Sequence, residues 1–162
     1  MDAEELIRRY KAGERDFSEV DLSEVQLVHA HLPNINLSNA NLSKAKLLWA
    51  DLSGADLSGA DLSGATLDCA TLDAADLSEA DLSGARFIES TLVEANLSYA
   101  DLSSADLSEA YLGNANLTGA IVDGALLGNN HSLHTADLTG VDLSKAVMDV
   151  FPYLSSDDLS NW

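Results

Sequence analysis

Basic residues and cysteine are scarce in this sequence. Eight Lys and Arg stand against 27 Asp and Glu among 162 residues, so the formal net charge is −19 and the pI is about 4.1. Direct binding to nucleic acid or to an anionic membrane requires clustered Lys and Arg, so this balance argues against both kinds of partner. A single cysteine excludes an intramolecular disulfide framework and a cysteine-based zinc site.

Long hydrophobic runs are also missing. No stretch approaches the roughly 20 apolar residues that a membrane span needs. The N-terminus lacks the apolar region of a signal peptide, so we expect a cytoplasmic protein. The hydrophobic content of 46% is nevertheless sufficient for a buried core in one domain, which makes simple disorder a poor explanation of the charge.

What the sequence has instead is a five-residue repeat. From Phe17 to Leu127 every fifth residue is large and apolar, without a slip, and Ala stands two residues before most of these centres. The residue before each centre is often Asp or Asn, and the residue after it is usually Ser. Residues 50–59, ADLSGADLSG, show the undisturbed unit twice.

A period of five selects the secondary structure. On an α-helix, five residues advance about 500°, so successive centres would spread around the cylinder. In an extended segment the Ala and the centre, two residues apart, point to the same side. Both stay inside in successive units only if the chain bends once per unit, and Gly, Asn and Ser at the boundary suit a bend. The period therefore predicts an all-β solenoid in which each side is one unit.

The unit A-(D/N)-L-S-x, repeated over about residues 15–150, resembles the pentapeptide-repeat family, in particular its cyanobacterial members. The resemblance implies the fold class, which is a right-handed quadrilateral β-helix with four units in each turn. It implies in addition that residues 20 apart in the sequence stack on one face of the solenoid.

A solenoid needs a cap at each end because its terminal coils lack a neighbour. Residues 2–12 have the pattern of an amphipathic helix, so we expect residues 1–14 to form an N-terminal helical cap. Residues 15–150 are expected to form the β-helix, with a one-residue register shift near 128–132, after which the centres are Leu133, Leu138, Leu143 and Met148. Residues 151–162 are expected to form a C-terminal cap or tail.

Two surfaces follow from stacking at intervals of 20. Two adjacent faces form an acidic wall that includes Asp16, Asp21, Asp56, Asp61, Asp76, Asp81 and Asp101. The third face carries apolar residues edged by two basic ones, and we call it the strip: Val28, Lys46, Leu48, Trp49, Cys69, Arg86 and Ile88. An apolar patch on a polar surface is typical of a partner-binding site, although scattered surface apolar residues without a role explain it about as well.

Motifs for catalysis are not found. No G-x-S-x-G elbow, P-loop or dinucleotide fingerprint occurs, and Cys69 has no adjacent base in the sequence. His131 and His134 near Asp137 lack a third well-spaced ligand, so we assign no catalytic residue, no metal and no cofactor. Stacked carboxylates about 4.8 Å apart are expected to repel and to raise the pKa of some wall residues.

Two functions remain open. The first is a non-enzymatic structural or protein-interaction module with a protein as its partner. The second is an acidic DNA mimic that binds DNA gyrase or topoisomerase, as the resemblance implies for quinolone-resistance members of the family. The oligomeric state is also open between a monomer and a dimer formed through the C-terminal aromatic residues Phe151, Tyr153 and Trp162.

Overall fold

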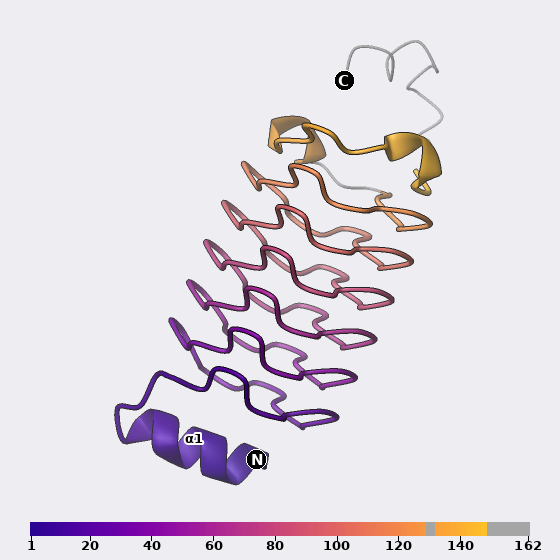
Figure 1. The fold of residues 1–162 in the computed structure, drawn as a ribbon. Helices are drawn as coiled ribbons and strands as arrows, with labels where there is room; N and C mark the ends of the chain where they lie inside the picture. Colours follow the sequence, from indigo (N-terminus) through magenta and orange to yellow (C-terminus); the bar gives the residue numbers. More distant parts are fainter. Residues whose placement is uncertain (129–131, 149–162) are drawn as a thin grey trace.

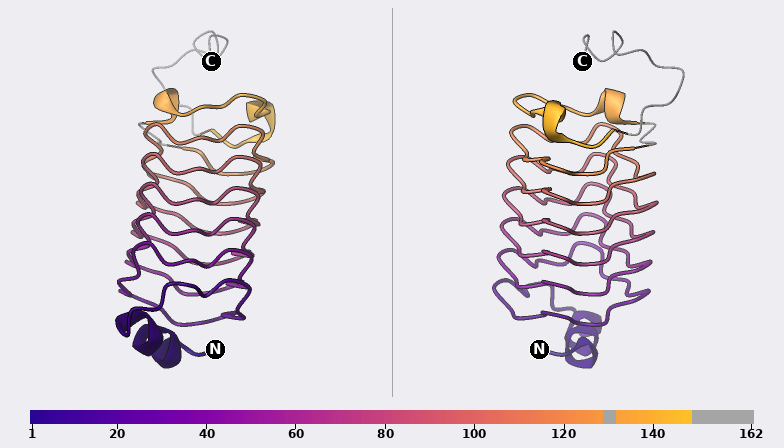
Figure 2. Two further views of the ribbon diagram at one scale, coloured as in Figure 1. Left: turned by 60° about the vertical axis from the view of Figure 1, so that its left-hand side comes forward. Right: turned by 90° about the vertical axis from the view of Figure 1, so that its right-hand side faces the viewer.

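The computed structural model describes residues 1–128 and 132–148, which form a column of stacked coils with a helix at one end (Figures 1 and 2). The helical elements in these residues are α1 (Ala3–Lys11) and the short 3-10 helices η1 (Leu133–Thr135) and η2 (Leu143–Lys145). The expected C-terminal cap at 151–162 and the middle of the predicted insertion lie outside the described residues. Within the described ranges, no helix is both long and apolar enough to cross a membrane.

Parallel bridges between residues 20 apart join each coil to the next. Asp56, for example, bridges Asn36 on one side and Asp76 on the other. One coil therefore holds four five-residue units, as the family resemblance implies. Between residues 16 and 126 each unit contributes a single bridged residue instead of a longer strand, because the next bend begins two residues later.

The bend is a tight turn at the end of each unit. In the unit around Leu52, the N–H of Ala55 donates to the carbonyl oxygen of Leu52 at 3.0 Å, and the intervening Gly54 has a φ of 64°. A type II turn requires a positive φ at this third position, which glycine adopts without strain. Trp49 and Cys69 occupy the same turn position with φ values of 59° and 56°.

The interior of the coils is filled by the centre residues and the small Ala residues beside them. Every centre from Phe17 to Leu127 is at most 2% exposed. Ser90 is the buried polar residue of the described core, and its hydroxyl donates to the carbonyl oxygen of Phe87 at 2.7 Å. The pattern of an inward centre and an inward Ala is therefore the one that the five-residue period predicts.

Helix α1 lies against the first coil (Figure 1). Asp2 is its N-cap and accepts a hydrogen bond from the N–H of Glu5 at 2.9 Å. Leu6 is fully buried and Tyr10 is 9% exposed. The Tyr10 hydroxyl donates to the carbonyl oxygen of Pro33 at 2.7 Å, which ties the helix to the first coil.

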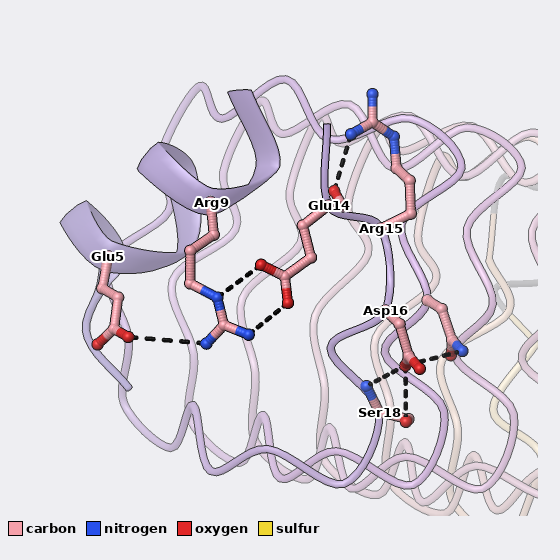
Figure 3. A network of polar contacts seen from close by, with 7 residues as sticks. Glu5, Arg9, Glu14, Arg15, Asp16 and Ser18 are labelled. Atoms are coloured by element: carbon pink, nitrogen blue, oxygen red, sulfur yellow. Dashed lines mark hydrogen bonds and ion pairs between the residues drawn. The ribbon is translucent and has the colours of Figure 1, made fainter. Parts of the chain in front are cut away.

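Charged residues connect α1 to the first unit (Figure 3). The guanidinium of Arg9 donates through Nε to Glu14 at 2.7 Å, makes a second contact with Glu14 through Nη2, and lies 3.6 Å from Glu5. Arg15 lies over the ring of Tyr10, with Cζ 3.8 Å from the ring centroid. This network fixes the direction in which the chain leaves the helix and enters the coils.

The spacing of the bridges changes near the C-terminal end. Asn116 bridges Asp137 and Leu126 bridges Val147, so the interval is 21 residues there. Leu133 is buried, whereas the later centres Leu138, Leu143 and Met148 are partly buried and pack against the core. The last described coil therefore contains one residue more than the coils before it.

Candidate functional site

The strip residues of the third face are held side by side by the coil hydrogen bonds. Bridges connect Gln26, Lys46, Thr66, Arg86 and Asp106 in order along this face. The neighbouring outward positions stack in register as a column of Val28, Leu48, Asp68 and Ile88. At the adjacent corner His29, Trp49, Cys69 and Glu89 stack in the same way, through hydrogen bonds such as that from the N–H of Cys69 to the carbonyl oxygen of Ile88 at 2.9 Å.

Trp49 is the most exposed apolar side chain of the strip. Its side chain is 57% exposed and that of Val28 is 46% exposed, whereas Leu48, Cys69 and Ile88 are half-buried. The imidazole of His29 stacks on the indole of Trp49, with ring centroids 6.3 Å apart and an interplanar angle of 22°. The stack presents a broad aromatic surface at the corner of the coil.

A basic edge runs beside the apolar column. Lys46 Nζ donates to the Thr66 hydroxyl at 3.3 Å, one coil further along. Arg86 Nη2 lies 3.0 Å from Oδ2 of Asp68, and the other oxygen of that carboxylate accepts from the N–H of Ile88 at 3.3 Å. The charge of Asp68 is therefore paired within the column, and the Arg86 side chain is directed along the face.

Sequence reasoning did not include Lys44 in this site. Lys44 is exposed at the corner on the other side of Lys46, and its Cγ would lie 3.6 Å from a Cβ placed on Gly64 of the next coil. The signal was present in the sequence, because position 44 is the turn residue two places before Lys46. The pairing of Arg86 with Asp68 was also missed, because it depends on side-chain direction across two coils.

Cys69 has the properties of an unreactive thiol. Burial raises its pKa, and the nearby carboxylates of Glu89 and Asp68 raise it further. A raised pKa lowers the fraction of thiolate, which is the nucleophilic form. Among the described residues, no group of three or more His, Cys, Asp or Glu side chains is placed to hold a metal ion.

The carboxylates of the acidic wall make local hydrogen bonds. In each of the seven Asp residues, Oδ1 accepts from the backbone N–H of the Ser two residues later, at 2.9–3.1 Å. Asn36, Asn41, Asn96 and Asn116 accept the same bond with their amide oxygens. The position therefore needs an acceptor and not a negative charge.

The two wall residues of the first coil have lowered pKa values. Hydrogen bonds from the hydroxyl and the N–H of Ser18 lower the pKa of Asp16. Hydrogen bonds from the N–H and the hydroxyl of Ser23 lower the pKa of Asp21. Their bridged partners in the next coil are the uncharged Asn36 and Asn41, so repulsion between stacked carboxylates does not act on these two residues.

A column of four-sided coils, each side one five-residue unit with an inward Leu and an inward Ala, defines a β-solenoid. The model for the family of pentapeptide repeats matches eight copies, over residues 21–59, 55–92 and 95–129. The chain therefore belongs to the pentapeptide-repeat family, and its fold is the right-handed β-helix of that family.

Solved structures of other family members are similar to this chain. HetL, a pentapeptide repeat protein involved in heterocyst differentiation regulation in the cyanobacterium Nostoc sp. strain PCC 7120, is 32% identical, with 90% of this chain and 84% of HetL covered and a TM-score of 0.35. The protein alr5209 of Nostoc PCC 7120 is 30% identical, with 91% of this chain and 96% of alr5209 covered and a TM-score of 0.31. A trypsin-treated variant of QnrB1, a plasmid-mediated fluoroquinolone resistance protein, is 20% identical. The match covers 90% of this chain and 85% of the QnrB1 chain, with a TM-score of 0.51. A comparison with curated proteins finds no match.

Proposed function

We propose that this protein is a non-enzymatic interaction module that binds a protein partner through the strip. The observation that carries the proposal is the Trp49 side chain, which is 57% exposed beside the apolar column of Val28, Leu48 and Ile88. Trp49 is also the largest side chain among the described residues with a positive φ. The positive φ itself belongs to the turn position, since fifteen other described non-glycine residues share it, so the proposal rests on the size and exposure of the indole.

The shape of the described surface supports a role in binding over a role in catalysis. One hollow lies between the last two coils near Gly119 and Asp142, and another lies at α1 near Asp2 and Arg8. Neither brings a Ser or Cys nucleophile together with a base. The interior of the coils is filled by Leu and Ala side chains, which leaves a continuous outer surface as the part that contacts other molecules.

The proposed organisation assigns a role to each part of the chain. Residues 1–14 act as the N-terminal cap, because α1 buries Leu6 and Tyr10 against the first coil. Residues 15–150 form the binding rod, and residues 151–162 are assigned as the C-terminal cap or tail. We assign the protein to the cytoplasm, and fractionation of the source cells with an antibody against the chain tests that assignment.

The alternative, a DNA mimic that binds gyrase, rests on the acidic wall. Hydrogen bonding in the turns already accounts for Asp or Asn at these positions, and the remaining charge keeps an elongated repeat protein soluble. Titration of the purified protein into a gyrase supercoiling reaction tests the alternative. Inhibition, or protection against a quinolone, at micromolar protein concentration would favour it over the interaction module.

The experiment for the proposed function uses affinity capture from a lysate of the source organism. The double variant Leu48→Asp with Trp49→Asp is expected to keep the β-rich circular dichroism spectrum and to lose the protein captured by the parent chain. Tyr99→Asp is the matched control, because Tyr99 is 64% exposed and has a positive φ at a different corner. Loss of the captured protein in the control as well, or its retention in the double variant, removes the strip from the proposal.

A further inference from the structure

Basic side chains are concentrated around the strip. Between residues 16 and 128 the sequence has three Lys and Arg residues, namely Lys44, Lys46 and Arg86. All three lie on the third face or at its corner, whereas the wall faces carry Asp, Asn and Ser. A chain with a net charge of −19 thus presents its apolar patch with a local edge of opposite sign.

The charges and the apolar groups are separated across the face. Lys44, Lys46 and Arg86 lie on one side of the apolar column of Leu48 and Ile88. The corner that carries Trp49 lies on the other side. A ligand that fits this order has apolar groups in its middle and carboxylates along one flank.

The coils leave no place for strand addition at the strip. Each bridging residue from Lys46 to Arg86 is already paired with the coil before it and the coil after it. An added strand needs unpaired backbone N–H and C=O groups at a sheet edge, so a partner must bind through side chains. An amphipathic α-helix does so because it presents a continuous apolar stripe while its own backbone groups are satisfied.

The spacing along the axis also suits a helix. Coils are about 4.8 Å apart, so Lys46 and Arg86, two coils apart, are separated by about 9.6 Å along the axis. Residues i and i+7 of an α-helix are about 10.5 Å apart on one face. The helical pitch of about 5.4 Å differs from the coil spacing by about 0.6 Å per turn, which side chains absorb over the few coils of the strip.

From these observations we infer that the strip binds an acidic amphipathic α-helix of a partner protein, aligned with the solenoid axis. The inference rests on the proposed function and adds the chemistry of the partner to it. Carboxylates on one flank of the helix pair with Lys44, Lys46 and Arg86, while its apolar stripe packs on Leu48, Ile88 and Trp49. Asp68 pairs with Arg86 and so does not repel the incoming carboxylates as a free charge would.

A second copy of this chain fits the strip less well. Its acidic wall has the required charge but presents no apolar stripe, because Ser follows the centre at nearly every wall position. Its strip has the apolar groups but brings a second basic edge. Sedimentation velocity tests this case. If the parent chain self-associates and Trp49→Asp abolishes the self-association, the strip binds a second copy of the chain and not a partner helix.

The test uses a synthetic helical peptide of about 16 residues, about 24 Å long, with Leu along one stripe and Glu at i, i+7 on its flank. A second peptide has Lys in place of each Glu. Binding is measured in the full chain carrying Trp162→Phe, so that Trp49 is the remaining tryptophan and reports occupancy by fluorescence. We expect the acidic peptide to bind roughly tenfold more tightly than the basic one, with the difference decreasing as salt is added.

Charge reversal in the chain completes the test. The triple variant Lys44→Glu, Lys46→Glu and Arg86→Glu is expected to lose the preference for the acidic peptide. The control variant Lys11→Glu with Lys145→Glu, which changes charge away from the strip, is expected to keep it. Equal or tighter binding of the basic peptide by the parent chain, or no binding of the acidic peptide at about 1 mM, overturns the inference.

The two proposals fail in different ways. If a cellular partner is lost with Leu48→Asp and Trp49→Asp but kept with the triple charge reversal, the strip is a binding site and the acidic helix is the wrong ligand. If the partner is kept by both variants, the proposed function itself is wrong.

Discussion

The ring of Tyr99 lies over Gly119, one coil further along the same corner. A Cβ placed on Gly119 would lie 2.7 Å from Cε1 and 2.8 Å from Cδ1 of that ring. Both residues hold a positive φ, 60° for Tyr99 and 68° for Gly119. The large residue at one turn is thus accommodated by the missing side chain at the next.

Replacement of Gly119 by Ala therefore has two costs, one from the backbone and one from the ring. Gly84→Ala is the control, since Gly84 has a φ of 63° and no atom within 4 Å of its added Cβ. We expect Gly84→Ala to lower the free energy of unfolding by about 1–2 kcal/mol and Gly119→Ala to lower it by more. Urea denaturation measures both. Adding Tyr99→Ala to Gly119→Ala is expected to remove the excess, and an excess that persists would contradict a clash with the ring.

The acidic wall provides a test of whether charge or hydrogen bonding matters for folding. Oδ1 of Asp56 accepts from the N–H of Ser58 at 3.0 Å and from its hydroxyl at 2.6 Å. We expect Asp56→Asn to leave the free energy of unfolding nearly unchanged, because Asn36 makes the same bonds one coil away. Asp56→Ala removes the acceptor and is expected to cost about 0.5–1.5 kcal/mol. Equal effects of the two variants in urea denaturation would mean that the charge itself stabilises the coil.

Acid is expected to weaken the first coil through the same hydrogen bonds. Because the folded pKa of Asp16 is lowered, its ionised form stabilises the fold above the unfolded pKa, and this contribution is lost as pH falls through the folded pKa. The hydroxyl of Ser18 is the largest cause for Asp16, whereas the N–H of Ser23 is the largest cause for Asp21. Ser18→Ala should therefore raise the pKa of Asp16 more than Ser23→Ala raises that of Asp21. Carboxyl carbon shifts in an NMR titration measure both, and the reverse order would contradict the assignment of causes.

The role of α1 is tested by removing it. Deletion of residues 1–13 exposes the apolar side chains of the first coil, including Phe17, and we expect the truncated chain to aggregate. Light scattering and sedimentation measure the change. Leu6→Ala is the milder variant. Because Leu6 is fully buried, we expect this variant to lower the free energy of unfolding by about 2–5 kcal/mol. Ile7→Ala, at a half-buried position, should lower it by less. A truncated chain that stays monomeric would show that the first coil needs no cap.

The sequence predicts the parts of this structure that depend on the period. Inward Leu and Ala, a bend in each unit and the outward position of Trp49 all follow from counting residues, because alternation and turn geometry are properties of the backbone. The family resemblance adds the four units per turn that place Lys46 and Arg86 on one face.

Other features depend on where side chains point, and the period carries no information on that. The pairing of Arg86 with Asp68, the stacking of His29 on Trp49 and the contact of Tyr99 with Gly119 are all of this kind. The lowered pKa values of Asp16 and Asp21 also depend on side-chain hydrogen bonds. The donors of Ser18 and Ser23 come from the turn that follows each Asp, and the prediction considered only the neighbouring coil.

Replacement of Trp49 by Gly separates stability from binding. At a φ of 59° a tryptophan is strained, and glycine occupies the equivalent turn at Gly54 and Gly64. Ala74→Gly serves as the reference, because the exposed Ala74 has a φ of 55° and its replacement relieves backbone strain with little loss of contact. We expect Trp49→Gly to unfold at a urea concentration equal to or above that of the parent chain. Its free energy of unfolding should change by an amount within about 1–2 kcal/mol of the gain in Ala74→Gly. The same variant is expected to lose the captured partner, whereas Ala74→Gly keeps it. A large loss of stability in Trp49→Gly would instead mean that the indole is needed for the fold, and that its exposure is not a sign of binding.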